Sequence, residues 1–273
     1  MVKLLFSLYI YLLIFLIFPS CGGGTGGTSS SSNVFSPSGV ILQKPTQVAI
    51  DSFGNIWVTE GNGLKEITSS AASAGFCSAS TCLIFSSVGS TSFSNLSGIA
   101  IDISGNIWVS DSAKNNIVEI PSGKTPSNCG GCISIGGAFK NPSGIAVDNS
   151  GNIWVSNTGN NNVIEIPKNF TSTSCSTNCT LIGGFSQPSG IAVDGGNSVW
   201  VTNKGNDTIA KIPALTTNVQ NGSCTNGCSI SQPIGIAVDQ SGNVWFTNSG
   251  NNTIVVLKGL AANTIQPIVS QTR

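Results

Sequence analysis

The sequence predicts an all-β protein, a β-propeller of four-stranded antiparallel blades, with five blades favoured and six possible. A repeated tryptophan, a repeated aspartate and a repeated strand pattern support this fold. The tryptophans recur at intervals of 51, 46, 46 and 45 residues, at Trp57, Trp108, Trp154, Trp200 and Trp245. An aspartate precedes each of them by six residues, at Asp51, Asp102, Asp148, Asp194 and Asp239. Between these markers, short apolar runs alternate with Asn/Gly turns, as β-strands require.

The unit Asn141–Ile166, NPSGIAVDNSGNIWVSNTGNNNVIEI, shows each predicted element in order. The run 144–147 is almost wholly apolar, as in a strand covered on both faces. A turn with Gly151 follows, then a strand at 152–157, an Asn/Gly turn and a strand at 162–166. A fourth apolar run lies at 180–185. Such a sheet cannot cover both of its faces alone, so a radial arrangement in which blades cover one another is expected.

Two further segments are strand-like, Val34–Gln43 and Thr264–Ser270, and one of them could close the ring on the other. The chain is otherwise neutral, with 8% charged and 40% hydrophobic residues. Nucleic-acid binding needs clustered Lys and Arg, so we expect no nucleic-acid partner. The absence of histidine removes the commonest general base and the commonest metal ligand.

The N-terminus indicates export, with a signal peptide at 1–20, a Gly/Ser/Thr-rich tether at 21–38 and the propeller at 39–273. The apolar run Leu4–Phe18, at about 15 residues, is short for a membrane span, which needs about 20. The small residue Ser20 before Cys21 resembles the lipobox of bacterial lipoproteins, which implies lipidation of Cys21 and attachment to the outer membrane or cell surface. The alternative is an ordinary secretory signal with a chance cysteine.

The other eight cysteines form close pairs, one pair in each of four repeats, between the third and fourth predicted strands. An oxidising compartment favours four local disulfides from these pairs. The alternatives are a zinc site and, at Cys129–Cys132, a redox motif. Both are disfavoured, because the pairs are spread around a ring and no βαβ unit is present. The paired residues are Cys77/Cys82, Cys129/Cys132, Cys175/Cys179 and Cys224/Cys228.

The motif PSGIAVD.SGNIWV.N.GNN.I.EI resembles the NHL repeat, and the resemblance covers about residues 45–258, with Leu96 in place of the repeat proline. It implies a propeller, usually of six blades. The repeats are also similar to those of streptogramin lyases, a resemblance that implies magnesium-assisted elimination with a histidine base, and this chain has no histidine. Gluconolactonase-like propellers hold a metal through residues that differ between blades, whereas these units are nearly identical. We therefore expect no cofactor, metal or catalytic residue.

The repeated aspartates fit Asx-type turns better than a catalytic or cation-binding ring, because one residue type serves every unit. Glu66, Glu119 and Glu165 share a position that also accepts Lys211, which favours a solvated strand face. Glu60 stands alone in a predicted loop. The Asn-rich loops between second and third strands are expected on one face with the Pro-Ser-Gly connections. The candidate binding face comprises Glu60, Asn62, Asn115, Asn160, Asn161, Asn206 and Asn251.

These patterns predict an exported, lipid-anchored binding module whose partner is a protein or an envelope glycan, with the membrane reached through Cys21. The alternative is a propeller enzyme of the lyase or lactonase type with a metal at its axis. A purely structural envelope component is a third possibility.

Overall fold

A computed structural model describes residues 42, 44–74, 82–88, 91–124, 129–222 and 229–263. The chain divides into two compact units, Met1–Phe35 and Ser36–Arg273, and every described residue belongs to the second. The predicted signal peptide, Cys21 and the tether up to residue 38 lie outside the described residues. So does nearly all of the first strand-like segment, and all of the second.

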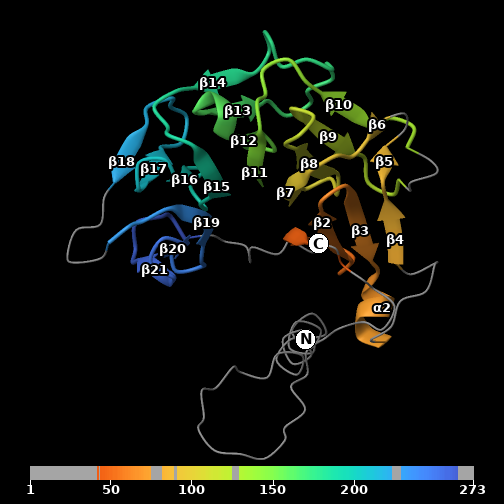
Figure 1. Cartoon of the computed structure of the whole chain (residues 1–273), viewed down its shortest axis with the longest axis horizontal. Coiled ribbons are helices and arrows are strands. Elements are labelled where there is room, and N and C mark those ends of the chain that lie inside the picture. Colours follow the sequence, from red (N-terminus) through yellow and green to blue (C-terminus); the bar gives the residue numbers. More distant parts are fainter. Residues whose placement is uncertain are drawn as a thin grey trace, which may run out of the picture. The chain divides into compact units, whose positions relative to one another are not determined.

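The described chain is a five-blade propeller of antiparallel sheets, which confirms the predicted fold class (Figure 1). Blade 1 contains β1 (Pro45–Ile50), β2 (Ile56–Glu60), β3 (Gly63–Ile67) and β4 (Cys82–Phe85); blade 2 contains β7 (Leu96–Ile101), β8 (Ile107–Asp111), β9 (Asn116–Ile120) and β10 (Ile133–Ile135); blade 3 contains β11 (Pro142–Val147), β12 (Ile153–Asn157), β13 (Asn162–Ile166) and β14 (Thr180–Ile182). Blade 4 contains β15 (Pro188–Val193), β16 (Val199–Asn203), β17 (Thr208–Ile212) and β18 (Gln220–Gly222); blade 5 contains β19 (Pro233–Val238), β20 (Val244–Asn248) and β21 (Thr253–Leu257).

Four blades have the predicted four strands, and the described part of blade 5 has three. Three short elements lie outside the blades. A hairpin of β5 (Ser87–Val88) and β6 (Thr91–Ser92) follows blade 1, and a 3-10 turn, η1 (Thr158–Asn160), joins β12 to β13. The six-residue helix α2 (Ser69–Ala74) follows β3 and was not predicted, because it is too short to show helical periodicity.

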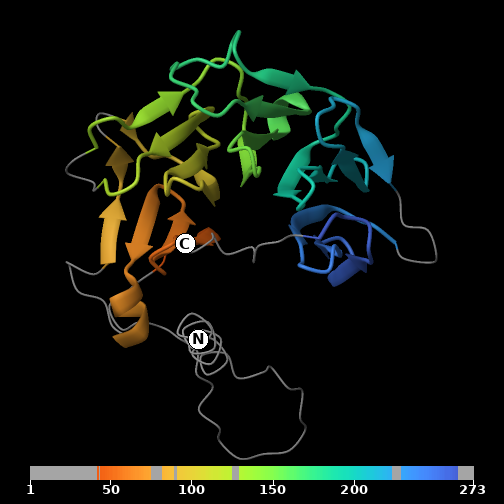
Figure 2. The same ribbon diagram turned by 180° about the vertical axis from the view of Figure 1, so that it is seen from behind.

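The first strands of consecutive blades lie side by side, in the order β1, β7, β11, β15 and β19. Figure 2 shows the same succession of blades from behind. The approach is close because a glycine stands in the first strand of blades 2, 3 and 4. In blade 3, a Cβ atom on Gly144 would lie 2.5 Å from the carbonyl oxygen of Ser189 in the next blade. Any larger residue would force these two strands apart.

Apolar clusters fill the space between neighbouring blades. Trp57 of blade 1 packs with Ile99 and Val109 of blade 2, and Trp154 of blade 3 packs with Ile191 and Val201 of blade 4. The core therefore consists of the contacts between neighbouring blades, as the sequence predicts. In blades 1 to 4, the repeated tryptophan is the side chain that packs against the next blade.

The aspartate six residues before each tryptophan holds the indole in place. In blade 3, Asp148 Oδ1 accepts the backbone N–H groups of Ser150 and Asn152, each at 2.9 Å, while Oδ2 accepts the N–H of Trp154 Nε1 at 3.0 Å. The turn interpretation of the aspartates is thus confirmed, with the indole bond added. The same carboxylate–indole bond occurs in all five blades, at 3.0, 3.1, 3.0, 3.0 and 2.8 Å.

In the described part of the chain no blade follows blade 5, so no neighbouring blade covers the side of its sheet that carries the tryptophan. Trp245 is 42% exposed, whereas its four counterparts are 4–6% exposed. Thr247, on the same face of β20, is also exposed, whereas Thr202 at the matching position of blade 4 is fully buried and donates to the carbonyl oxygen of Ile234. The carboxylate–indole hydrogen bond is therefore buried in blade 3 and open to water in blade 5.

This difference gives a matched test of the carboxylate–indole bond. We expect Trp154→Phe to lower the free energy of unfolding by about 2 kcal/mol, because a charged, buried oxygen of Asp148 loses the hydrogen bond that the indole N–H donates. Trp245→Phe should cost clearly less, since water can replace the lost donor. Urea unfolding of both variants measures the difference, and equal losses would contradict a buried role for this bond.

Candidate functional site

The two faces of the propeller carry different turns and connections. We call the first the amide face: it carries the connections between blades and the turns between second and third strands. Asn115 Oδ1 accepts the backbone N–H of Asn141 in the next blade at 2.7 Å, and Asn161 Oδ1 accepts that of Gln187 at 2.8 Å. Asp207 does the same for Gln232 at 2.7 Å. These bonds place the turns beside the connections, as the sequence predicts.

We call the second the aspartate face: it carries the Asp turns and the chain that follows each third strand. The backbone N–H of Ser122 donates to Asn106 Oδ1 at 3.1 Å, and that of Lys168 donates to Asn152 Oδ1 at 3.0 Å. The N–H of Gly259 donates to Asn243 Oδ1 at 3.1 Å in the same manner. In these three blades the segment that follows the third strand therefore begins against the Asp turn of its own blade.

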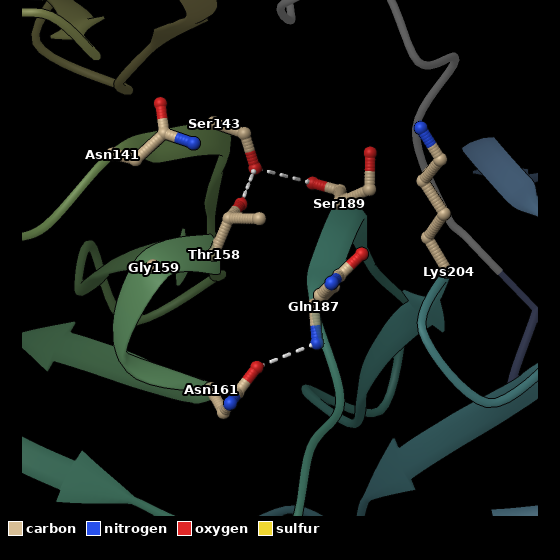
Figure 3. A pocket seen from close by; sticks show the side chains of 8 residues that line it. All are labelled: Asn141, Ser143, Thr158, Gly159, Asn161, Gln187, Ser189 and Lys204. Carbon is tan, nitrogen blue, oxygen red and sulfur yellow. Dashed lines mark hydrogen bonds between the residues drawn. The ribbon is translucent and has the colours of Figure 1, made fainter.

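A hollow of about 510 Å³ opens on the amide face between blades 3 and 4 (Figure 3). Ser143 Oγ lies 2.8 Å from Thr158 Oγ1 and donates to the carbonyl oxygen of Ser189 at 3.1 Å, which ties the walls together. The lining is wholly polar or glycine: Asn141, Ser143, Thr158, Gly159, Asn161, Gln187, Ser189 and Lys204.

Four side chains around this hollow have hydrogen-bonding capacity to spare. Within the described residues, the carboxamides of Asn141 and Gln187, the Ser189 hydroxyl and the Lys204 ammonium make no hydrogen bond. Asn141 and Gln187 are exposed and have positive φ angles of 48° and 45°. Free donors and acceptors on a fixed backbone can bind a ligand rich in hydroxyl or amide groups.

Most of the predicted binding residues lie on the amide face, and Asn161 alone lines the hollow. Asn160 and Asn251 each donate a side-chain N–H to a backbone carbonyl, of Ala138 and Ser229, and Asn115 supports the next blade. Asn206 accepts from Thr208 Oγ1 at 2.9 Å. Asn62 is exposed in the turn between β2 and β3.

Glu60 is the exception to this placement. It ends strand β2 with 7% of its surface exposed, and one of its carboxylate oxygens, Oε1, lies 2.9 Å from Lys65 Nζ. It is therefore a partner in a buried ion pair rather than part of a loop surface. Lys65 stands on β3 where blades 2 and 3 place Val118 and Ile164, so this pair replaces apolar packing in blade 1.

Sequence reasoning missed the other lining residues, although a signal was available. Asn141 and Gln187 directly precede the repeat proline, and Ser143 and Ser189 directly follow it. The repeat predicts these connections on this face, but it does not show which of their side chains line a hollow. No sequence pattern points to Lys204, because the equivalent turns of the other blades carry different residues at this position.

Two disulfides are described, Cys129–Cys132 and Cys175–Cys179, and Cys82 is also disulfide-bonded. Both bridges lie between the third and fourth strands of their blades, as predicted. Cys77, Cys224, Cys228 and Cys21 lie outside the described residues. The bridges indicate an oxidising, exported environment. Within the described residues no helix has the length and apolarity needed to span a membrane.

Glu66, Glu119 and Glu165 sit beside the Asp turns and are half-buried rather than solvated. Burial, followed by the negative charge of Asp51, raises the pKa of Glu66 to about 6. Burial, followed by the negative charge of Asp102, raises the pKa of Glu119, and burial followed by the charge of Asp148 raises that of Glu165. A second hollow, of about 220 Å³, lies on the aspartate face between blades 1 and 2, with Glu66, Phe53 and Lys124 in its lining. No group of three or more His, Cys, Asp or Glu residues in the described ranges could hold a metal ion.

The comparisons with known proteins agree with this geometry. Residues 139–164 match the NHL repeat. No curated protein matches the chain. Among solved structures, a catalytically inactive variant of virginiamycin B lyase from Staphylococcus aureus, in complex with quinupristin, has a TM-score of 0.63 at 20% identity, covering 82% of this chain and 70% of that one.

Two other structures have the same fold. A streptogramin B lyase has a TM-score of 0.61 at 16% identity, covering 78% of this chain and 68% of that one. A gluconolactonase from Xanthomonas campestris has a TM-score of 0.58 at 12% identity, covering 82% of this chain and 75% of that one. The chain thus contains a segment that matches the NHL repeat, and the low identities to the solved structures show the propeller fold alone.

The raised pKa of Glu66 predicts a pH dependence of stability. Since the folded state holds the proton more tightly than the unfolded state, stability falls as the pH rises from about 4.5 through 6. Glu66→Gln should flatten this fall and raise stability at pH 7 by about 1 kcal/mol or less, because solvent screens a half-buried group. Urea unfolding between pH 4.5 and 7.5 measures both effects. A variant with the wild-type slope would rule out Glu66 as the cause.

Proposed function

We propose that this protein is an exported, lipid-anchored binding module whose ligand is a glycan of the bacterial cell envelope. The ligand binds at the hollow between blades 3 and 4 on the amide face. The observation that carries this proposal is the set of free polar side chains there: two carboxamides, one hydroxyl and one ammonium.

A glycan suits this set better than a protein does. Carboxamides donate and accept hydrogen bonds, and so they match sugar hydroxyl groups, which do both as well. A hollow of about 510 Å³ has room for a short oligosaccharide. A stable protein interface needs about 800 Å² of surface on each partner, well beyond this hollow. Lys204 adds one positive charge, which favours an acidic sugar over a neutral one.

Binding of envelope oligosaccharides to the full-length protein in mild detergent tests the proposal. We expect Gln187→Ala and Lys204→Ala each to weaken binding by about tenfold, because each removes hydrogen bonds to the ligand. Gln232→Ala is the matched control: Gln232 also precedes a repeat proline with φ 45°, but it does not line the hollow.

Equal effects of the Gln187 and Gln232 variants would overturn the site. Capture of an envelope protein, with no glycan bound, would overturn the ligand class. Chemical turnover of a bound glycan would show an enzyme, which is the competing function for this fold.

The anchor is the second part of the proposal and rests on the lipobox-like sequence before Cys21. Cells supplied with a labelled fatty acid should label the wild-type protein but not the Cys21→Ser variant, because only a thiol at this position accepts the lipid. Equal labelling of both proteins would show that Cys21 is not the lipidated residue.

A further inference from the structure

Four large apolar side chains protrude from the aspartate face. Their exposed fractions are high for residues of this type: Phe53 74%, Ile103 82%, Leu215 105% and Leu260 54%. Phe53 and Ile103 lie in the Asp turns of blades 1 and 2. Leu215 and Leu260 lie in the connections that follow the third strands of blades 4 and 5. The free energy of folding gains nothing from side chains left in water.

Leu215 is the most informative of the four. Its φ angle is 59°, in the left-handed region that disfavours side chains with a Cβ. The matching positions of blades 2 and 3 hold Gly123 and Asn169, with φ angles of 74° and 66°. Glycine and asparagine are the residues that this turn favours. Blade 4 instead places a fully exposed leucine there, at a cost to local stability that the fold does not require.

Lysines accompany the apolar side chains on this face. Lys168 and Lys258 are exposed, and Lys124 borders the hollow beside Phe53. The aliphatic part of Lys168 lies over Gly151, 3.0 Å from the point where a Cβ atom would stand. The turn carboxylates accept backbone N–H groups and an indole N–H, as Asp148 shows, and the half-buried Glu66, Glu119 and Glu165 lie beside them.

We propose that the aspartate face rests on a lipid bilayer, with Phe53, Ile103, Leu215 and Leu260 inserted at the level of the headgroups. A protein partner favours one contiguous apolar patch of matching shape. Here the apolar side chains stand singly on four blades, separated by polar turns. A fluid interface needs no such complementarity, and it accepts apolar tips together with lysines that reach the lipid phosphates.

The inference is independent of the proposed glycan and deals with the opposite face of the propeller. It gives that site an orientation: with the aspartate face on the bilayer, the amide face and its hollow point away from the membrane. A binding module placed in this way presents its free carboxamides to the space beyond the lipid.

Hydrogen exchange of the full-length protein, with and without phosphatidylcholine–phosphatidylglycerol vesicles, tests the inference. We expect exchange to slow several-fold in segments 52–55, 102–106, 213–216 and 258–261 when vesicles are present. Segments 158–161 and 204–207 of the amide face should not change. Equal protection of both faces, or of neither, would overturn the proposal. Protection that needs an added envelope protein would also overturn it.

Two pairs of variants sharpen the test. The double variant Phe53→Ser/Leu215→Ser should lose most of the vesicle-dependent protection. The matched control Ile84→Ser/Leu181→Ser removes side chains that are 59% and 51% exposed on the outer strands β4 and β14, and it should keep the protection. Leu215→Gly should weaken protection of its own segment without lowering stability in urea, since glycine suits the turn. Loss of stability in this variant would show a structural role for Leu215 instead.

Discussion

The bond between the turn carboxylate and the indole N–H is the interaction on which the rest of the propeller depends. The carboxylate of one aspartate accepts the backbone N–H groups of its turn and also the indole N–H of the tryptophan that the next blade covers. A local turn and a long-range core are thus coupled through a single carboxylate. This explains why both residues recur at the same six-residue interval, and why the interval does not vary although the blade length does.

The centre of the propeller is held by polar rather than apolar contacts. Hydroxyl groups near the start of the first strands, or facing them, donate to carbonyl oxygens of the next blade. Examples are Ser97 to Pro142 at 3.0 Å, Ser143 to Ser189 at 3.1 Å and Thr202 to Ile234 at 2.8 Å. Such bonds need close strands, which glycine permits. Because these central bonds hold the blades together, the side chains of the two faces can differ. The amide face has carboxamides without a hydrogen-bond partner among the described residues, and the aspartate face has exposed apolar side chains.

The candidate site shows where sequence reasoning reaches its limit. Asn115 and Asn161 occupy equivalent positions in the repeat and both accept a backbone N–H of the next blade. Asn161, unlike Asn115, lines the hollow between blades 3 and 4. The difference depends on what the neighbouring blade brings alongside, here Gln187 and Lys204. Glu60 was expected in a loop because it departs from the repeat. It is buried because Lys65, five residues later, turns back beside it across a hairpin.

The sequence by itself determined the blade, its strand order, the structural role of the aspartates and the two described disulfide pairs. Each of these depends on residues close together in the chain. Each is also repeated in several blades, so the agreement between repeats supports the interpretation of any one of them. Only the tertiary structure decided which blades cover one another's tryptophans, where the hollow forms and which apolar tips share a face. Those features arise between blades, from residues about 45 positions apart whose meeting no local pattern encodes.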